Sequence, residues 1–326
     1  QLYVHDSTTI VLPDLLAQQW PGCGGTPAAA NTLSALKLQL RLELRQGSLA
    51  GPILQAGRAH DRHLCLLPRP APGSLRLADL GYWSLEELAQ DDADGRYWLM
   101  RLKSNTRLYD ELQQPLELLK LLQRVQGEPL DRAVQLGVTQ RLGCRLLAVR
   151  VASEVAERRR AEALRLAADK GEQLSELSLA LFDWTIAVTN VPSAMLTAAE
   201  GLVLSHIRWQ IEIFVRLWKD EGKVDEWRGR RAGRVLCEVY AKLLALLLQH
   251  WLVLSQSWQY PDRSLVKCLR TIRKYALELA TAVQTGVRLE VVLRRIQGAL
   301  AATDRMNKRK QHPNTFQELL ALSGSS

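Results

Sequence analysis

The stretch Leu75-Arg-Leu-Ala-Asp79-Leu-Gly-Tyr-Trp83-Ser-Leu-Glu-Glu-Leu88 indicates how this chain folds. Its first residues are mostly apolar, as in a short buried strand, and the strand is predicted to end at Asp79. Gly81 allows the backbone to turn sharply after the acid. Ser84 is then placed to cap a helix that begins with the next residue. The sequence therefore predicts a strand, an acidic residue and a helix in succession, as in an α/β protein.

A second acidic residue, Asp6, lies inside the run from Leu2 to Leu12, which is rich in β-branched and aromatic residues and predicts another strand. An acid within an apolar strand is unfavourable to bury unless it is paired or binds a cation. The alternative is an aspartate at the strand end that faces water. Alternation of apolar and polar residues from Leu36 to Arg45 predicts a further strand with one buried face, and Tyr97 to Leu102 adds one more.

A third acid lies on a predicted helix, Ser205-His-Ile-Arg208-Trp-Gln-Ile-Glu212-Ile-Phe-Val-Arg216-Leu-Trp-Lys219. Positions three, four and seven residues apart share a helix face, so the three basic residues project beside Glu212, with Ser205 one turn further back. By itself such a charged stripe is typical of a solvated helix surface, where each pair adds about 0.2–0.5 kcal/mol. The two acids upstream favour a functional interpretation.

Three motifs occur here in a fixed order: Asp-Ser-Thr from Asp6, Asp-x-Gly-Tyr from Asp79, and Arg-x-x-x-Glu from Arg208. In this the chain resembles the DDE transposases of bacterial insertion sequences, in the cut-and-paste group marked by Tyr-x-x-Arg-x-x-x-Glu-x-x-x-x-x-x-Lys. Arg208, Glu212 and Lys219 fit that spacing. The tyrosine position is occupied by Ser205.

The resemblance implies a ribonuclease-H-like fold, in which a mixed sheet holds Asp6 and Asp79 on adjacent strands and a helix brings Glu212 beside them. It also implies DNA cleavage at transposon ends and strand transfer into target DNA, with these three acids as the catalytic residues. Carboxylates suit hard cations, so we expect them to bind Mg²⁺ or Mn²⁺, as two ions. The residues expected to contact DNA are Arg208, Lys219, Arg216 and Ser205.

The expected organisation has four parts. Residues 1–103 and 185–223 would form the catalytic core, interrupted by a largely β insertion over 104–184, and residues 224–326 would form a helical C-terminal region. Within the insertion, Ser153 to Lys170 reads as a charged helix. The sequence begins with Gln1, inside a predicted strand, so we expect the family's N-terminal DNA-binding region to be missing from it.

Composition favours a polyanionic partner, because 43 Lys and Arg against 34 Asp and Glu give a net charge of +9. One basic cluster follows the Glu212 helix, and another lies at Arg305 to Lys310. The apolar helix from Leu243 to Leu254 is interrupted by Gln249 and His250, which predicts a core helix and no membrane span. Five cysteines without Cys-x-x-Cys spacing predict buried thiols in a reducing cytoplasm.

The expected partners follow from the resemblance: DNA, as terminal inverted repeats and target, bound by a homodimer in the bacterial cytoplasm with the nucleoid. Three alternatives remain open. In these alternatives the chain would be a metal-dependent nuclease without strand transfer, a catalytically impaired relic that binds DNA, or a helical scaffold for a protein partner. Tryptophans such as Trp98 and Trp184 could stack on a displaced base, but core packing is the preferred interpretation.

Overall fold

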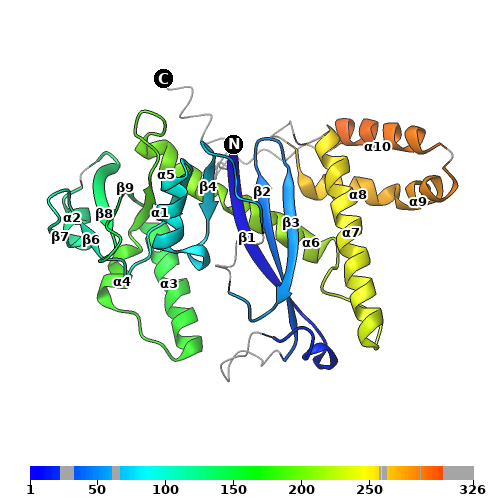
Figure 1. Ribbon diagram of the computed structural model, residues 1–326, viewed down its shortest axis with the longest axis horizontal. Coiled ribbons are helices and arrows are strands. Elements are labelled where there is room, and N and C mark those ends of the chain that lie inside the picture. The colour runs from blue at the N-terminus through cyan, green and yellow to red at the C-terminus, as the bar shows by residue number, and fades with distance from the viewer. Residues whose placement is uncertain are drawn as a thin grey trace.

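The computed structural model describes residues 1–22, 33–60, 67–125, 127–256, 258, 263–286 and 288–303. Within these residues, ten strands form one mixed sheet in the order β3-β2-β1-β4-β5-β10-β9-β8-β6-β7, with helices on both faces (Figure 1). The prediction of a mixed α/β fold is therefore confirmed.

The strands are β1 (Leu2–Val11), β2 (Ala35–Glu43), β3 (Leu49–Ala56), β4 (Leu75–Ala78), β5 (Tyr97–Arg101), β6 (Leu108–Tyr109), β7 (Pro115–Leu116), β8 (Leu130–Leu136), β9 (Leu142–Arg150) and β10 (Trp184–Thr189). The α-helices are α1 (Leu85–Ala93), α2 (Leu118–Gln123), α3 (Ser153–Lys170), α4 (Glu176–Leu181), α5 (Ala198–Ile207), α6 (Trp209–Asp220), α7 (Ala232–Gln256), α8 (Leu265–Lys274), α9 (Ala276–Thr285) and α10 (Leu289–Thr303).

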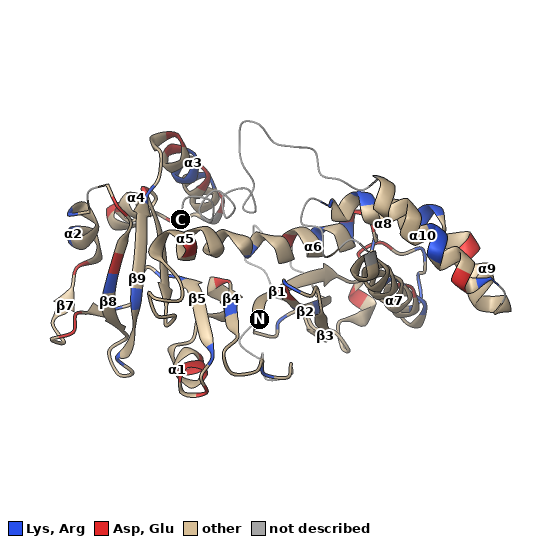
Figure 2. Ribbon diagram, turned by 90° about the horizontal axis from the view of Figure 1, so that it is seen from above, with Lys and Arg blue, Asp and Glu red and all other residues tan. Residues whose placement is uncertain are grey.

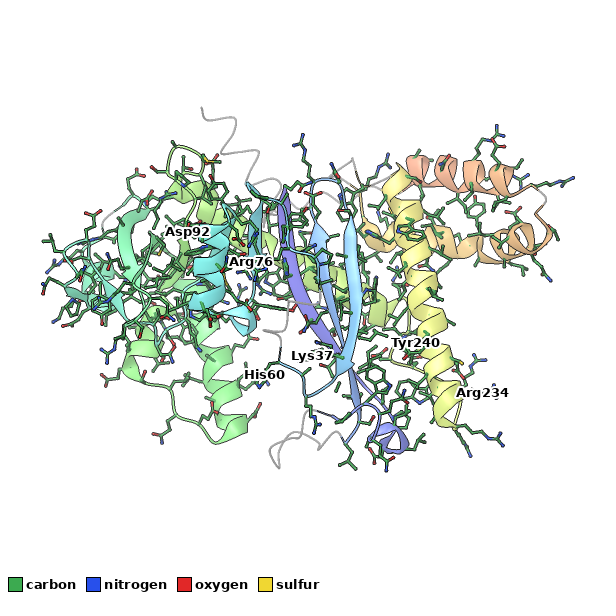
Figure 3. All side chains as sticks on the ribbon, viewed as in Figure 1. Lys37, His60, Arg76, Asp92, Arg234 and Tyr240 are labelled. Carbon is green, nitrogen blue, oxygen red and sulfur yellow. The ribbon has the colours of Figure 1, made fainter. Side chains whose placement is uncertain are left out.

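The centre of the sheet is parallel, since β4 pairs in the same direction with β1 and with β5. Parallel neighbours need a crossover connection, and α1 provides it between β4 and β5. Asp91 on the inner side of α1 pairs with Arg76 of β4 at 2.6 Å and with Arg96 at 2.9 Å. Figure 3 shows Arg76 beside this helix. These buried ion pairs fix α1 against the sheet.

Helices α5 and α6 cross the opposite face of the sheet as a nearly continuous rod (Figure 2). Side chains alternate between the two faces of a strand, so Val4 and Ile10 of β1 point to this face and join Ile211 and Phe214 of α6 in the main core. The same alternation directs Asp6 toward α6. Gly201 brings α5 close to β9, because a Cβ at this position would lie 2.6 Å from Leu147.

The described C-terminal region is helical. One face of α7 packs in the main core, and His250 on that face bonds through Nε2 to the carbonyl oxygen of Gly47, 2.7 Å away. Helices α8, α9 and α10 enclose a smaller core with part of α7. Of the helices in the described ranges, α7 alone is long and apolar enough, by length and composition, to cross a membrane.

The prediction of a core helix here is correct for one face of α7 only. The other face is exposed and carries Leu244, Leu248 and Trp251. Their spacing is four and then three residues, and it extends backward to Cys237 and Ala241 and forward to Ser255, all of them exposed. Exposure of Cys237 contradicts the prediction of buried thiols, although Cys268 is buried as expected.

Of the local predictions near the acids, the helix cap is confirmed, whereas the turn and the long helix differ in the structure. Ser84 caps α1 as expected, accepting a hydrogen bond from the backbone of Glu87 at 3.4 Å. The preceding turn is a 3₁₀ turn, Leu80–Tyr82, and Gly81 is not among the glycines with positive φ, so this turn does not need glycine. The single helix expected from Ser205 to Lys219 is divided at Arg208, where the backbone N–H of Ile211 bonds to the Arg208 carbonyl in an i to i+3 pattern.

Candidate active site

Three acids from distant parts of the chain meet where β1, β4 and α6 adjoin. Asp6 lies in the middle of β1, and Asp79 follows the last residue of β4. The two strands are parallel neighbours, with His5 opposite Ala78, so Asp6 and Asp79 are the next residues along each strand. The opposing helix supplies Glu212. The structure therefore brings together the three acids that the sequence singled out.

The guanidinium of Arg208 lies between two of these acids. Its Nη1 donates a hydrogen bond to Oε1 of Glu212, one helical turn further on, and its Nε lies 3.9 Å from Oδ1 of Asp79. The Arg208 side chain is only 12% exposed, against 45% for Asp79 and 28% for Glu212. The three side chains thus form a charged group that is open to solvent mainly on the carboxylate side.

The carboxyl of Asp6 has a pKa that its surroundings change. Burial raises the pKa of its carboxyl from 3.8 to about 6, and the negative charges of Glu212 and Asp79 act in the same direction. The backbone N–H of Ser7, which donates to Oδ1 at 2.8 Å, and the charge of Arg208 lower the pKa and offset part of this effect. Clustered carboxylates that disfavour one another's charge are stabilised by a cation.

The donor set fits a hard divalent cation, because it consists of carboxylates without thiol or imidazole. Among the residues that the structure describes, however, no three His, Cys, Asp or Glu side chains already lie close enough together to share one ion. The Arg208 guanidinium, held between Asp79 and Glu212, is the cation that these acids contact. The chemistry therefore suits Mg²⁺, whereas binding requires the acids to rearrange around it.

The other basic candidates lie on the same helix but have other partners. Nζ of Lys219 donates to the backbone carbonyl of Thr9 on β1, at 3.0 Å. Arg216 is exposed, with its guanidinium 5.9 Å from the ring centre of Trp209. The hydroxyl of Ser205 donates to the Leu202 carbonyl at 2.7 Å, so it is satisfied within its own helix.

Two residues near the site were not predicted from the sequence. Trp209, beside Arg208, is 50% exposed, whereas Trp98 and Trp184 are buried in the core as the sequence analysis preferred. His5, next to Asp6, is buried on the opposite face of the sheet, and burial, with Arg76 and Arg41 nearby, holds its pKa well below the usual value. Only the three-dimensional structure shows that Trp209 is half exposed whereas Trp98 and Trp184 are buried.

The basic cluster after α6 is partly neutralised by its neighbours. Lys223 pairs with Glu226 at 3.0 Å and Arg234 with Glu238 at 3.5 Å. Arg230 and Arg231 are exposed, and no ion pair to either is seen among the described residues. Figure 3 places Arg234 at the lower end of α7. The second cluster, Arg305 to Lys310, lies outside the described residues.

The chain is similar to known transposases. The transposase DDE domain family matches residues 1–248, and the chain belongs to this family. The chain is 26% identical to the transposase for insertion sequence element IS231F of Bacillus thuringiensis subsp. israelensis, over 97% of this chain and 71% of that protein. It is 29% identical to the IS231C transposase of B. thuringiensis subsp. berliner, over 76% and 55% of the two chains.

A third relative, the transposase for insertion sequence element IS1151 of Clostridium perfringens, is 26% identical over 78% of this chain and 57% of its own length. The chain thus spans little more than half of several relatives that it matches. The prediction of a DDE transposase of insertion sequences is confirmed at the level of the family.

Proposed function

We propose that this chain cleaves DNA at transposon ends and transfers the cut strand into target DNA. The observation that carries this proposal is the convergence of Asp6, Asp79 and Glu212 from two parallel strands and a facing helix. Membership of the transposase DDE domain family supports it. The arrangement of acids on adjacent central strands is also what a ribonuclease-H-like core requires, and we assign that core to residues 1–103 and 185–223.

In this proposal Asp6, Asp79 and Glu212 hold Mg²⁺ or Mn²⁺, as two ions. When bound, such ions activate water or a 3′ hydroxyl and stabilise the oxygen that leaves the phosphodiester. The protein itself positions these acids: β1 and β4 fix two carboxylates on one rigid sheet, and α6, which packs on the face of that sheet, supplies the third. Arg208 and Arg216 would contact phosphates of the bound DNA, with Lys219 and Ser205 at either end of the same stripe.

The insertion, residues 104–184, extends the sheet through β8 and β9, which continue from β10. Its charged helix α3 has the bounds expected from the sequence, and two of its arginines contact the residues around the start of β10. Arg160 pairs with Asp183, and Arg159 donates to the Trp184 carbonyl at 3.2 Å. We propose that α3 holds the beginning of β10, the strand that leads into α5 and α6.

We further propose that two copies act together on paired inverted repeats, in the bacterial cytoplasm. The outer face of α7 supports this, since Leu244, Leu248 and Trp251 follow the alternating spacing of four and three residues that pairs helices in coiled coils. A helix of 25 residues is about 37 Å long, enough for three such repeats. Two copies of the same stripe are complementary to each other.

The main test is cleavage of a duplex that carries the element's inverted repeat, in the presence of Mg²⁺. Asp79→Ala and Glu212→Ala should each abolish cleavage while the circular dichroism spectrum stays unchanged. Wild-type activity in either variant would refute the assignment. An assay that also supplies a pre-cut transposon end distinguishes the alternatives. Joined products would indicate strand transfer, and cleavage without joining would indicate a nuclease. DNA binding without cleavage or joining would indicate a relic.

A further inference from the structure

Arg208 occupies the position between two acids that the proposed function assigns to metal binding. Its Nη1 is bonded to Oε1 of Glu212, and its Nε lies 3.9 Å from Oδ1 of Asp79. The side chain is largely buried, so water screens these contacts poorly. A basic side chain of the protein therefore supplies positive charge beside these two acids.

A guanidinium in this position competes with a divalent ion. Oε1 of Glu212 cannot accept the Arg208 hydrogen bond and ligate a metal in the same direction, and two cations beside the same carboxylates repel each other. Arg208 and Glu212 are one helical turn apart, so their pairing is favoured whenever α6 is formed. For the carboxylates to gather around an ion, the Arg208 side chain has to move.

A DNA phosphate is the partner best suited to draw Arg208 away. The planar guanidinium can bind a phosphate through two parallel hydrogen bonds. To Glu212 it donates one hydrogen bond, from Nη1. Arg208 also lies at the junction of α5 and α6, where the hydrogen-bond pattern changes and the next residue, Trp209, is half exposed. Bound DNA therefore has access to this part of the helix.

We propose that Arg208 is an internal counter-cation that keeps metal from Asp79 and Glu212 until a DNA phosphate displaces it. The inference rests on the proposed function, because it takes these acids to be metal ligands. Metal and DNA would then bind cooperatively, and by linkage each would raise the affinity for the other by the same factor, typically about 5- to 150-fold. Metal loading would be restricted to the complex with DNA.

The test is Mn²⁺ binding, followed by electron paramagnetic resonance of the free ion, with and without a short duplex of mixed sequence. In the absence of DNA, Arg208→Gln should bind Mn²⁺ about tenfold more tightly than the wild type. Adding the duplex should raise the affinity of the wild type and leave that of Arg208→Gln nearly unchanged. Arg294→Ala, which removes an exposed arginine paired with Glu290 on α10, controls for net charge.

Equal Mn²⁺ affinities for the wild type and Arg208→Gln without DNA would overturn the inference, as would an equal response of both to the duplex. Arg208→Lys provides a second variant that keeps the charge but cannot span both acids. Its Mn²⁺ affinity should lie between those of the wild type and Arg208→Gln. Glu212→Gln tests the underlying site separately. If this variant binds Mn²⁺ like the wild type in the presence of the duplex, the proposed metal site fails; if binding is lost there, the site stands whatever Arg208 does.

Discussion

The ammonium of Lys219 donates a hydrogen bond to the backbone carbonyl of Thr9, 3.0 Å away, and so joins the last turn of α6 to the strand that carries Asp6. Arg208 makes its contacts at the other end of the same helix. Helix α6 is therefore held at both ends, once by an ion pair and once by the sheet backbone. Lys219 thus connects α6 to β1 by a contact within the protein.

We predict that Lys219→Met lowers the free energy of unfolding by about 1–2 kcal/mol, because a charge-assisted hydrogen bond is lost and the Thr9 carbonyl is left without this donor. Urea denaturation measures the change. Lys219→Arg keeps a charged donor and should recover most of the stability. If Lys219→Met were as stable as the wild type, the contact with β1 would not hold α6.

Ser205 stands in the tyrosine position of the family signature, and its hydroxyl is used within α5. We therefore expect Ser205→Ala to change DNA cleavage less than twofold. Ser205→Tyr should increase cleavage of a transposon end, because it restores an aromatic surface and a longer hydroxyl beside the acids. Initial rates on a labelled duplex provide the measurement. A large loss in Ser205→Ala would show that the serine itself has a role.

The burial of His250 predicts that the stability of the protein depends on pH. Burial lowers its pKa below 6.5, although the hydrogen bond with Gly47 opposes the shift. The unfolded chain therefore takes up a proton more readily, and the stability present above pH 6.5 is lost as the pH falls through the folded-state pKa. His250→Gln keeps a donor to Gly47 but does not titrate. Between pH 7.5 and 5, the thermal midpoint of the wild type should fall more than that of His250→Gln.

The exposed stripe on α7 predicts self-association. Replacing Leu244 and Leu248 by glutamate puts like charges on both sides of the proposed contact and should convert dimers to monomers of 36.7 kDa, as measured by light scattering. Leu277→Glu on α9 is the matched control, since Leu277 is also exposed but lies on a different helix. A dimer that persists in the double variant would place the interface elsewhere.

The positions of the two aspartates were predictable because their signals are local. An apolar run that ends in Asp79 and a β-branched run around Asp6 each predict a strand from a few neighbouring residues, and the structure pairs these strands directly. The order of the motifs then identified the family, which the comparisons confirm. Helix α3 was placed with the bounds that the structure has.

Individual side-chain contacts between other distant residues were not predictable. The partner of Lys219 is 210 residues away, and no periodicity indicates that an ammonium will select one backbone carbonyl. The exposed face of α7 was missed because both of its faces are apolar, so composition does not reveal which face the core covers. Spacing placed Arg208 beside Glu212, but Asp79 became its neighbour only through tertiary structure.

The single sheet determines how the chain can be shortened. β10 is hydrogen-bonded to β5 on one side and to β9 on the other, and β9 to β8. Removing the segment from β6 to β9 would leave β10 with a row of unpaired backbone groups, which promotes aggregation through the open edge. The segment from β6 to β9 is thus an integral part of the sheet, and a shortened version of this protein would have to keep it or replace the lost strand.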